Sequence, residues 1–420
     1  MTNKSAVIVF AAFCTTLIAY TIRYGYGILL PYMIQSMGIS KTSAGTIYSS
    51  YFLSYTLFSP FLGWLSDKYN IRIILTVFTL MLAFGAFLMS YSTSVLNASL
   101  FFVISGIGHA ACWAPVMALV QRAVADKNRG MALAITSMGS AVGIAGLGLV
   151  LPVIVSYYTW RGGWMVMGIF GFGVAMINYL LIPDFSQNSE AISPNPKDMA
   201  SDKNVAASKK YGMILKNKTL WFIGISYSLV GFAVLVPYTF LSAYTTEKLN
   251  FTFTQTSRCF TVMAISGIAG KLILGCLSDI IKRVHVMMIC GILLGIGCMG
   301  MGMSQMDEIS QITVMLESLG ISSPVGMIYL FSVVFGLGFG AVWPVYAAAA
   351  PDFFDGNISG SVIGLWTGFM GIGSILSPTL CGWTIDQTNG YTLAFTMGTV
   401  CSVASAIFLI PVIKPARLHS

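Results

Sequence analysis

Long apolar runs separated by short polar stretches make up most of this chain. A helix needs about 20 consecutive apolar residues to cross a lipid bilayer, and twelve runs reach that length. They span residues 6–34, 44–66, 72–92, 97–120, 131–157, 163–183, 219–245, 256–279, 284–305, 325–349, 359–382 and 391–413. The pattern therefore predicts an all-α integral membrane protein with both termini on the same side of the membrane, because the number of crossings is even.

One polar stretch, at 184–218, is much longer than the others. It is rich in Ser, Asn and Lys and contains Pro194 and Pro196, a composition typical of a linker outside the membrane. It divides the chain into an N-terminal six-helix bundle at 1–183 and a C-terminal six-helix bundle at 219–420. Residues 209–218 fit either a short amphipathic helix on the membrane surface or an irregular segment.

The two predicted bundles repeat each other in sequence. GYGILLPY at 25–32 matches GFAVLVPY at 231–238, and GIGHAACW at 106–113 matches GLGFGAVW at 336–343. FLGWLSDKYNIR at 61–72 matches ILGCLSDIIKR at 273–283. The matches keep the same order and direction, which indicates a parallel duplication. Transporters built in this way pack their two pseudo-symmetric halves around an axis along the membrane normal.

Composition and charge support a membrane protein and argue against other classes. Of the 420 residues, 56% are hydrophobic and only 9% are charged, and a soluble fold cannot bury that much apolar surface. The formal net charge is +8, but Lys and Arg gather in alternate loops, as cytoplasmic loops do. The distribution predicts a multi-pass protein of the cytoplasmic membrane with both termini in the cytoplasm, and it argues against nucleic-acid binding.

The sequence shows no sign of catalytic chemistry. It contains no G-x-x-x-x-G-K-[ST] motif for a nucleotide and no Ser-His-Asp arrangement. Its eight Cys residues form no C-x-x-C pair. We therefore expect no enzymatic activity, no cofactor and no metal site, and we expect a monomer. The first apolar run continues to Leu30 without a small-residue cleavage site, so we interpret it as a spanning helix rather than a signal peptide.

Arg23 and Lys271 are the strongest candidates for a binding site. Arg23 lies inside a long run that is otherwise uncharged, and Lys271 lies inside the uncharged stretch between Arg258 and Asp279. A cation at such a depth costs about 2.5–3.5 kcal/mol. The 14 acidic residues all fall at predicted helix ends or in loops, so neither cation has an obvious carboxylate partner. An anionic substrate held between them would recover that cost. The alternatives are a Lys271 head that reaches the membrane surface and an Arg23 bonded to backbone carbonyls.

Aromatic residues and one histidine accompany these cations. His109 and Trp113 are four residues apart, which places them on one face of the predicted helix at 97–120. Their counterparts in the second repeat are Phe339 and Trp343. His109 is a candidate for proton handling because an imidazole titrates near neutral pH, although a lone buried histidine is often a packing residue. We expect Trp113, Phe339, Trp343 and Tyr26 to contribute to a cavity wall.

Two short motifs resemble those of a known family. G-x-L-S-D followed by basic residues, at 63–67 and again at 275–279, resembles the signature loop of the major facilitator superfamily. RYGYGILLP at 23–31 and the stretch at 106–143 are similar to its monocarboxylate and oxalate/formate branch. The resemblance implies a cavity lined by helices one, four, seven and ten. It also implies a carboxylate-binding arginine shortly before the second motif, where this chain has Lys271 instead.

Four charged residues near the two motifs form a candidate gate at the cytoplasmic surface: Asp67, Arg72, Asp279 and Arg283. Charge pairs at this position can hold helices together in one state and release them in the other. The alternative is that they are solvated helix ends.

Together these features predict a secondary transporter for a small organic anion, favouring a monocarboxylate, that works by alternating access. Because no acidic residue lies in the interior of a predicted membrane segment, both proton symport and anion exchange stay open. Efflux of amphipathic compounds is an alternative within transport, although a basic cavity argues against cationic cargo. A non-transporting membrane sensor with the same fold is a second alternative.

Overall fold

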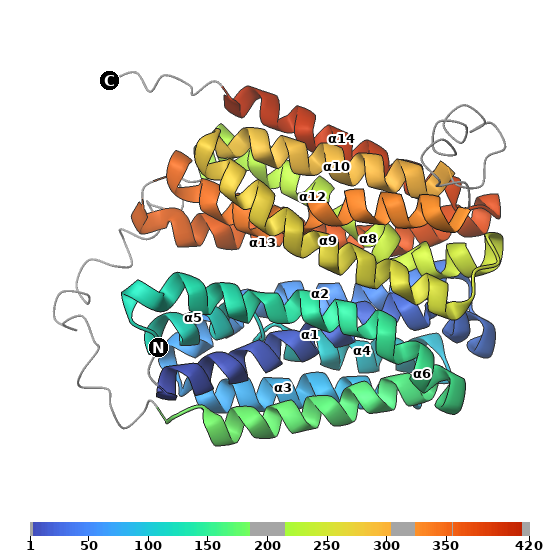
Figure 1. The fold of residues 1–420 in the computed structure, drawn as a ribbon, viewed down its shortest axis with the longest axis horizontal. Coiled ribbons are helices and arrows are strands. Elements are labelled where there is room, and N and C mark those ends of the chain that lie inside the picture. The colour runs from blue at the N-terminus through green and yellow to red at the C-terminus, as the bar shows by residue number, and fades with distance from the viewer. Residues whose placement is uncertain (1–2, 185–214, 304–323, 355, 414–420) are drawn as a thin grey trace.

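The computed structural model describes residues 3–184, 215–303, 324–354 and 356–413, and the secondary structure of these residues is helical. In the N-terminal half the helices are α1 (Asn3–Met37), α2 (Lys41–Lys68), α3 (Ile71–Met89), α4 (Val95–His109), α5 (Ala114–Ala123) and α6 (Asp126–Leu181). In the C-terminal half they are α8 (Lys218–Lys248), α9 (Phe253–Ile280), α10 (Arg283–Met303), α12 (Pro324–Phe353), α13 (Gly356–Thr388) and α14 (Thr392–Ile413). The long axes of the helices run roughly parallel to one another across both halves (Figure 1).

Within the described residues, the helices account for the twelve predicted crossings. Ten helical segments of the described chain are long and apolar enough to span, counting α4 and α5 as one. One of these segments, α6, has 56 residues and reverses direction at Thr159, whose backbone has φ 62° and ψ −179°, so it crosses twice. The more polar helix α2, with 28 residues, supplies the remaining crossing.

Local sequence sets several helix starts. The Ser40 side chain accepts a hydrogen bond from the Ser43 amide at the start of α2. Ser94 with Asn97 and Thr252 with Gln255 form reciprocal capping boxes at the starts of α4 and α9. Such caps satisfy backbone amides that have no partner within the helix, and they fix the tight turns between neighbouring crossings.

The continuous helix predicted at 97–120 is wrong. The chain leaves helical geometry after His109 and resumes it at Ala114, as α4 and α5. Pro115 lies in the first turn of α5, where its missing amide hydrogen costs nothing. In an uninterrupted helix its ring would clash with the carbonyl of residue 111. His109 and Trp113 therefore do not share a helix face.

The two halves meet along three helix pairs: α1 with α8, α2 with α13, and α6 with α9. The backbones approach closely at Gly27, where a Cβ atom would lie 1.8 Å from the carbonyl oxygen of Tyr238. Small residues at such crossings let helices pack closely in a membrane. Gly27 lies in the second half of α1, towards the end of the bundle that is remote from the chain termini (Figure 1).

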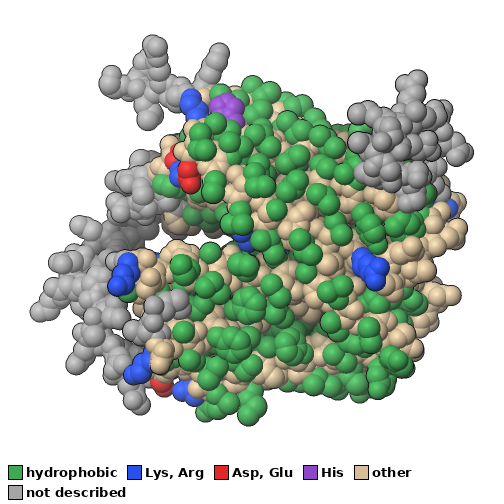
Figure 2. Space-filling model, viewed as in Figure 1, with side chains coloured by type: hydrophobic (Ala, Val, Ile, Leu, Met, Phe, Trp, Pro, Cys, Tyr) green, Lys and Arg blue, Asp and Glu red, His purple; other side chains and the backbone are tan. Residues whose placement is uncertain are grey.

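Polar contacts close that remote end. The Asp386 carboxylate of α13 accepts hydrogen bonds from the amides of Lys41 (3.0 Å) and Thr42 (2.8 Å) and from the Thr42 hydroxyl (2.6 Å). The Lys41 ammonium lies 2.5 Å from Glu247 of α8. At the end that carries the termini, a notch opens between the halves (Figure 2). The figure also shows a largely hydrophobic flank, as lipid contact requires.

Candidate functional site

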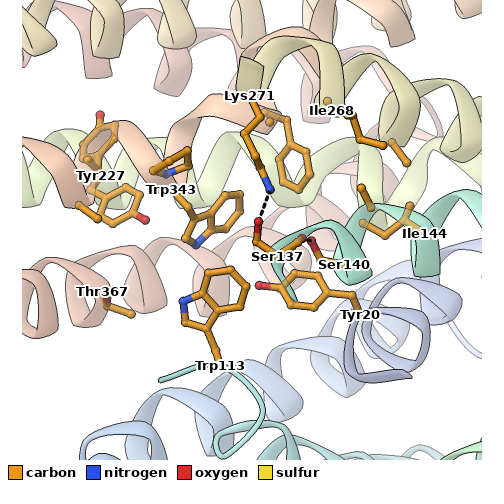
Figure 3. Close-up of a pocket in the computed structure, with 18 of the residues that line it drawn as sticks. Tyr20, Trp113, Ser137, Ser140, Ile144, Tyr227, Ile268, Lys271, Trp343 and Thr367 are labelled. Carbon is orange, nitrogen blue, oxygen red and sulfur yellow. Dashed lines mark hydrogen bonds between the residues drawn. The ribbon is translucent and has the colours of Figure 1, made fainter. Parts of the chain in front are cut away.

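A cavity of about 220 Å³ lies between the two halves. The N-terminal half contributes residues of α1 and α6 and the segment between α4 and α5, and the C-terminal half contributes α8, α9, α12 and α13. Most of the wall is aromatic or aliphatic, and the polar groups come from a few side chains (Figure 3). A concave apolar site with a few convergent polar groups is typical of small-molecule binding.

Lys271 is the one charged side chain among the described residues that line this cavity. It extends from α9 towards α6, and its ammonium lies 3.5 Å from the Ser137 hydroxyl (Figure 3). Ser140, one turn further along α6, also lines the cavity. No carboxylate of the described residues lies within 4.0 Å of the Lys271 ammonium. A cation thus faces the cavity from one half, with hydroxyls opposite it in the other.

The structure places Arg23 outside this cavity. Its side chain is only 3% exposed, and its guanidinium lies 4.5 Å from the ring centre of Phe52 and 4.9 Å from that of Tyr55. The rings of Tyr20, Tyr24 and Tyr51 complete the enclosure at 5.7–6.0 Å. Among the described residues no carboxylate lies within 4.0 Å of this cation either. Interaction with ring faces therefore takes the place of an ion pair.

Arg23 borders a second, much smaller cavity of about 10 Å³. Trp343 and Thr367 line both cavities, so they form the partition between Lys271 and Arg23. The two cations that the sequence singled out thus border separate cavities that share two wall residues, and they do not face one common cavity in this state of the protein.

His109 also lies behind the cavity wall. It is fully buried at the end of α4, and its Nδ1 atom is 2.6 Å from the Tyr51 hydroxyl. Its ring contacts those of Tyr20 and Tyr55 at 5.4 and 5.2 Å. These contacts are those of a packing residue next to the Arg23 enclosure. The break after α4 turns Trp113 into the cavity while His109 stays behind it.

The predicted aromatic wall is present in part. Phe339 and Trp343, on the continuous helix α12, both line the cavity, with their ring centres 5.1 Å apart. Trp113 faces them from the N-terminal half. Tyr26 is elsewhere: its hydroxyl donates to the Ala44 carbonyl at 2.6 Å and its ring stacks on Tyr48 at 4.8 Å. We therefore leave Tyr26 out of the site.

Several lining residues had no signal strong enough to identify them from the sequence. Tyr227 and Tyr346 stack at 4.2 Å on one side of the cavity. Trp366 lines it as well and donates its indole hydrogen to the Leu220 carbonyl at 3.1 Å. Ser137 lies on the predicted fifth helix, and only its contact with Lys271 distinguishes it from other small residues there.

The charged residues at the repeated loops are arranged differently in the two halves. The Asp67 side chain lies outside the described residues. Arg72 lies over the ring of Tyr179 at 4.3 Å. In the second repeat Arg283 pairs with Asp352 of α12, whereas Asp279 is exposed and has no ion pair with a described residue.

Sequence comparison places the whole chain in one family. The profile of the Major Facilitator Superfamily matches residues 12–319 and 238–420. Monocarboxylate transporter 12 of Xenopus laevis is 21% identical over 84% of this chain and 76% of its own length. The hexuronate transporter of Bacillus subtilis is 22% identical over 98% of this chain and 95% of its own length. A probable sulfoacetate transporter of Cupriavidus necator is 22% identical over 90% of this chain and 86% of its own length.

Solved structures agree on the fold. The nucleoside transporter NupG superposes with a TM-score of 0.74 at 14% identity, covering 98% of this chain and 99% of its own. A bacterial homologue of the human lysosomal transporter Spinster, in an inward-facing and unoccupied conformation, gives a TM-score of 0.74 at 15% identity. The match covers 98% of this chain and 96% of that protein. The chain is therefore a member of the Major Facilitator Superfamily, with two six-helix bundles around a central cavity.

Proposed function

We propose that this protein is a secondary transporter that carries a small organic anion, a monocarboxylate, across the cytoplasmic membrane. The observation that carries the proposal is the position of Lys271. Its ammonium faces a cavity between the two halves and has no carboxylate partner among the described residues. An anionic ligand would offset the cost of keeping this cation away from water.

Arg23 strengthens the preference for an anion. It is a second cation behind the Trp343 partition and likewise lacks a carboxylate partner among the described residues. Two uncompensated positive charges in a medium of low dielectric favour a negative ligand and oppose a positive one. The names of three relatives point the same way, because monocarboxylate, hexuronate and sulfoacetate are all organic anions.

The contacts between the halves support alternating access. Asp386, Lys41 and Glu247 close the end that is remote from the termini, while the other end is notched. Rocking of the halves would break the first set of contacts and expose the cavity on the opposite side. With both termini in the cytoplasm, the present state opens inward. Transport is driven either by a co-transported proton or by exchange for a second anion.

Uptake into proteoliposomes tests this function. The purified protein would be supplied with labelled lactate, pyruvate, formate or oxalate, with and without a pH gradient or an internal anion. We expect saturable uptake of a monoanion and a loss of at least about tenfold in Lys271→Gln, because the charge-assisted hydrogen bond is worth about 1.5–3 kcal/mol. Arg258→Gln, an exposed site on the same helix, is the matched control.

The driving force follows from the same assay. Stimulation by an inward proton gradient indicates symport, and stimulation by internal anion alone indicates exchange. The proposed role of this cavity would be refuted if Lys271→Gln took up every anion that the protein carries at the same rate as Arg258→Gln does.

A further inference from the structure

The wall of the cavity limits the kind of anion that fits it, and here we build on the proposed transport of an organic anion. We propose that the preferred substrate is a monoanion with a flat aromatic body, that is, an aryl-substituted carboxylate. The charge, the shape and the size of the cavity each contribute to this inference.

The charge of the cavity matches a single carboxylate. Lys271 is the one charged group of the described lining, and its ammonium lies 3.5 Å from the Ser137 hydroxyl. Arg23 is separated from this space by Trp343 and Thr367. A second carboxylate on the ligand would therefore face rings without a counter-charge, and burial of an unpaired charge is strongly unfavourable. A dianion is thus a poorer fit than a monoanion.

Rings form the rest of the wall. Trp113 faces Trp343 across the cavity, and Tyr227 lies on the side away from Lys271 (Figure 3). Phe339, with its ring centre 5.1 Å from that of Trp343, and Tyr346, stacked on Tyr227 at 4.2 Å, also line the cavity. Trp366 adds a third indole. Aromatic groups prefer offset-stacked or edge-to-face contacts with other rings. The rings of the wall already pack on one another in both ways, at 14° between the Tyr227 and Tyr346 planes and at 83° between Phe339 and Trp343.

The volume fits a ligand with a body beyond its acid group. A space of about 220 Å³ is many times larger than one water needs, which is about 10–15 Å³ on the same measure. Formate or lactate would leave much of this space as water in contact with indole and phenyl faces. A flat apolar body would displace that water and bury the rings, which is the main source of affinity in such a site.

The same rings do not make this a site for cations. Aromatic cages bind quaternary ammonium groups through the ring faces, and the cavity resembles such a cage in its composition. Lys271 inside it and Arg23 behind it would repel a cationic ligand. The combination of a single cation with an aromatic wall is specific to an anion with an apolar body.

Equilibrium binding to the purified protein in lipid nanodiscs tests the inference. The probe is radiolabelled phenylacetate, displaced by acetate, phenylacetamide, phenylmalonate or phenethyltrimethylammonium. These compounds lack the ring, lack the charge, carry a second carboxylate, or reverse the charge. We expect phenylacetate to bind at least about tenfold more tightly than each of the other four, a difference of about 1.4 kcal/mol.

Variants separate the ring wall from the cation. Trp343→Leu and Trp113→Leu, on opposite walls, should each reduce the preference for phenylacetate over acetate to about threefold or less. Trp383→Leu, at a lipid-facing tryptophan that is 54% exposed, is the matched control and should keep the preference. Lys271→Gln should abolish displaceable phenylacetate binding, which also excludes simple partitioning of the probe into lipid.

The outcomes distinguish this inference from the proposed function. If acetate binds as tightly as phenylacetate while Lys271→Gln still abolishes binding, the aromatic preference is refuted and anion transport stands. If phenylmalonate binds as tightly under the same condition, the preference for a monoanion is refuted and anion transport again stands. If Lys271→Gln binds phenylacetate and acetate as the parent protein does, the proposed function fails and the inference fails with it. An unchanged preference in both Trp113→Leu and Trp343→Leu would also overturn the inference.

Discussion

Asp386 should control how readily the remote end of the protein opens. Its carboxylate accepts three hydrogen bonds at the first turn of α2, at 2.6–3.0 Å, and so joins the C-terminal half to the N-terminal half. The partial positive charge of a helix N-terminus favours a carboxylate there by up to about 2 kcal/mol in partly buried sites. In Asp386→Asn the neutral amide keeps one acceptor atom but loses the charge.

The magnitude follows from this contact alone. Loss of about 1–2 kcal/mol would raise the population of the state open at this end by a factor of about 5–30. The assay is the reaction rate of a cysteine at position 49 with a membrane-impermeant thiol reagent, with exposed Cys276 replaced by serine. Ser49 is 8% exposed and donates to the Ile375 carbonyl of α13 at 2.6 Å, so labelling reports separation of α2 from α13.

A matched carboxylate provides the control. Asp352→Asn removes an ion pair with Arg283 that lies within the C-terminal half, and it should leave the labelling rate at position 49 unchanged. Equal rates in Asp386→Asn and in the parent protein would show that the cap on α2 does not hold the halves together, and the reasoning would be refuted.

Two further predictions concern packing. Gly340→Ala should lower the melting temperature in a thermal shift assay, because the added Cβ would lie 1.8 Å from the Gly267 carbonyl oxygen in the α9–α12 crossing. The control Gly63→Ala, at a glycine with open space around it, should leave the melting temperature unchanged. Equal melting temperatures for these two variants would contradict the close approach. Tyr51→Phe should cost about 1–3 kcal/mol of stability, because it removes the hydroxyl that lies 2.6 Å from His109. Its melting temperature should be lower than that of the control Tyr69→Phe, at an exposed tyrosine. Equal melting temperatures for the two variants would argue against this hydrogen bond.

The helices were predictable because the bilayer imposes their length and composition. Both ends of α8 fall within three residues of the predicted 219–245, for example. The break between α4 and α5 was not predictable. Pro115 is compatible with a kinked helix, a new helix start or a helix end, and packing decides among these. The reversal at Thr159 joins two predicted helices, which local sequence places only to within a few residues.

The site was predictable where a single residue stands out and not where the environment comes from distant segments. Lys271 stands out because the bilayer makes a lone cation costly, and the structure places it at the cavity. The enclosure of Arg23 depends on Phe52 and Tyr55 of α2. No spacing rule along one helix reveals such contacts, so the partition between the two cations became visible only in the folded protein.

The most direct test of the central claim is an experimental structure of the protein with its anionic substrate bound. We expect a carboxylate oxygen about 2.7–2.9 Å from the Lys271 ammonium, between the two halves and against the faces of Trp113 and Trp343. An anion bound away from Lys271, or a Lys271 head group paired with a carboxylate of the protein itself while substrate occupies the cavity, would contradict it.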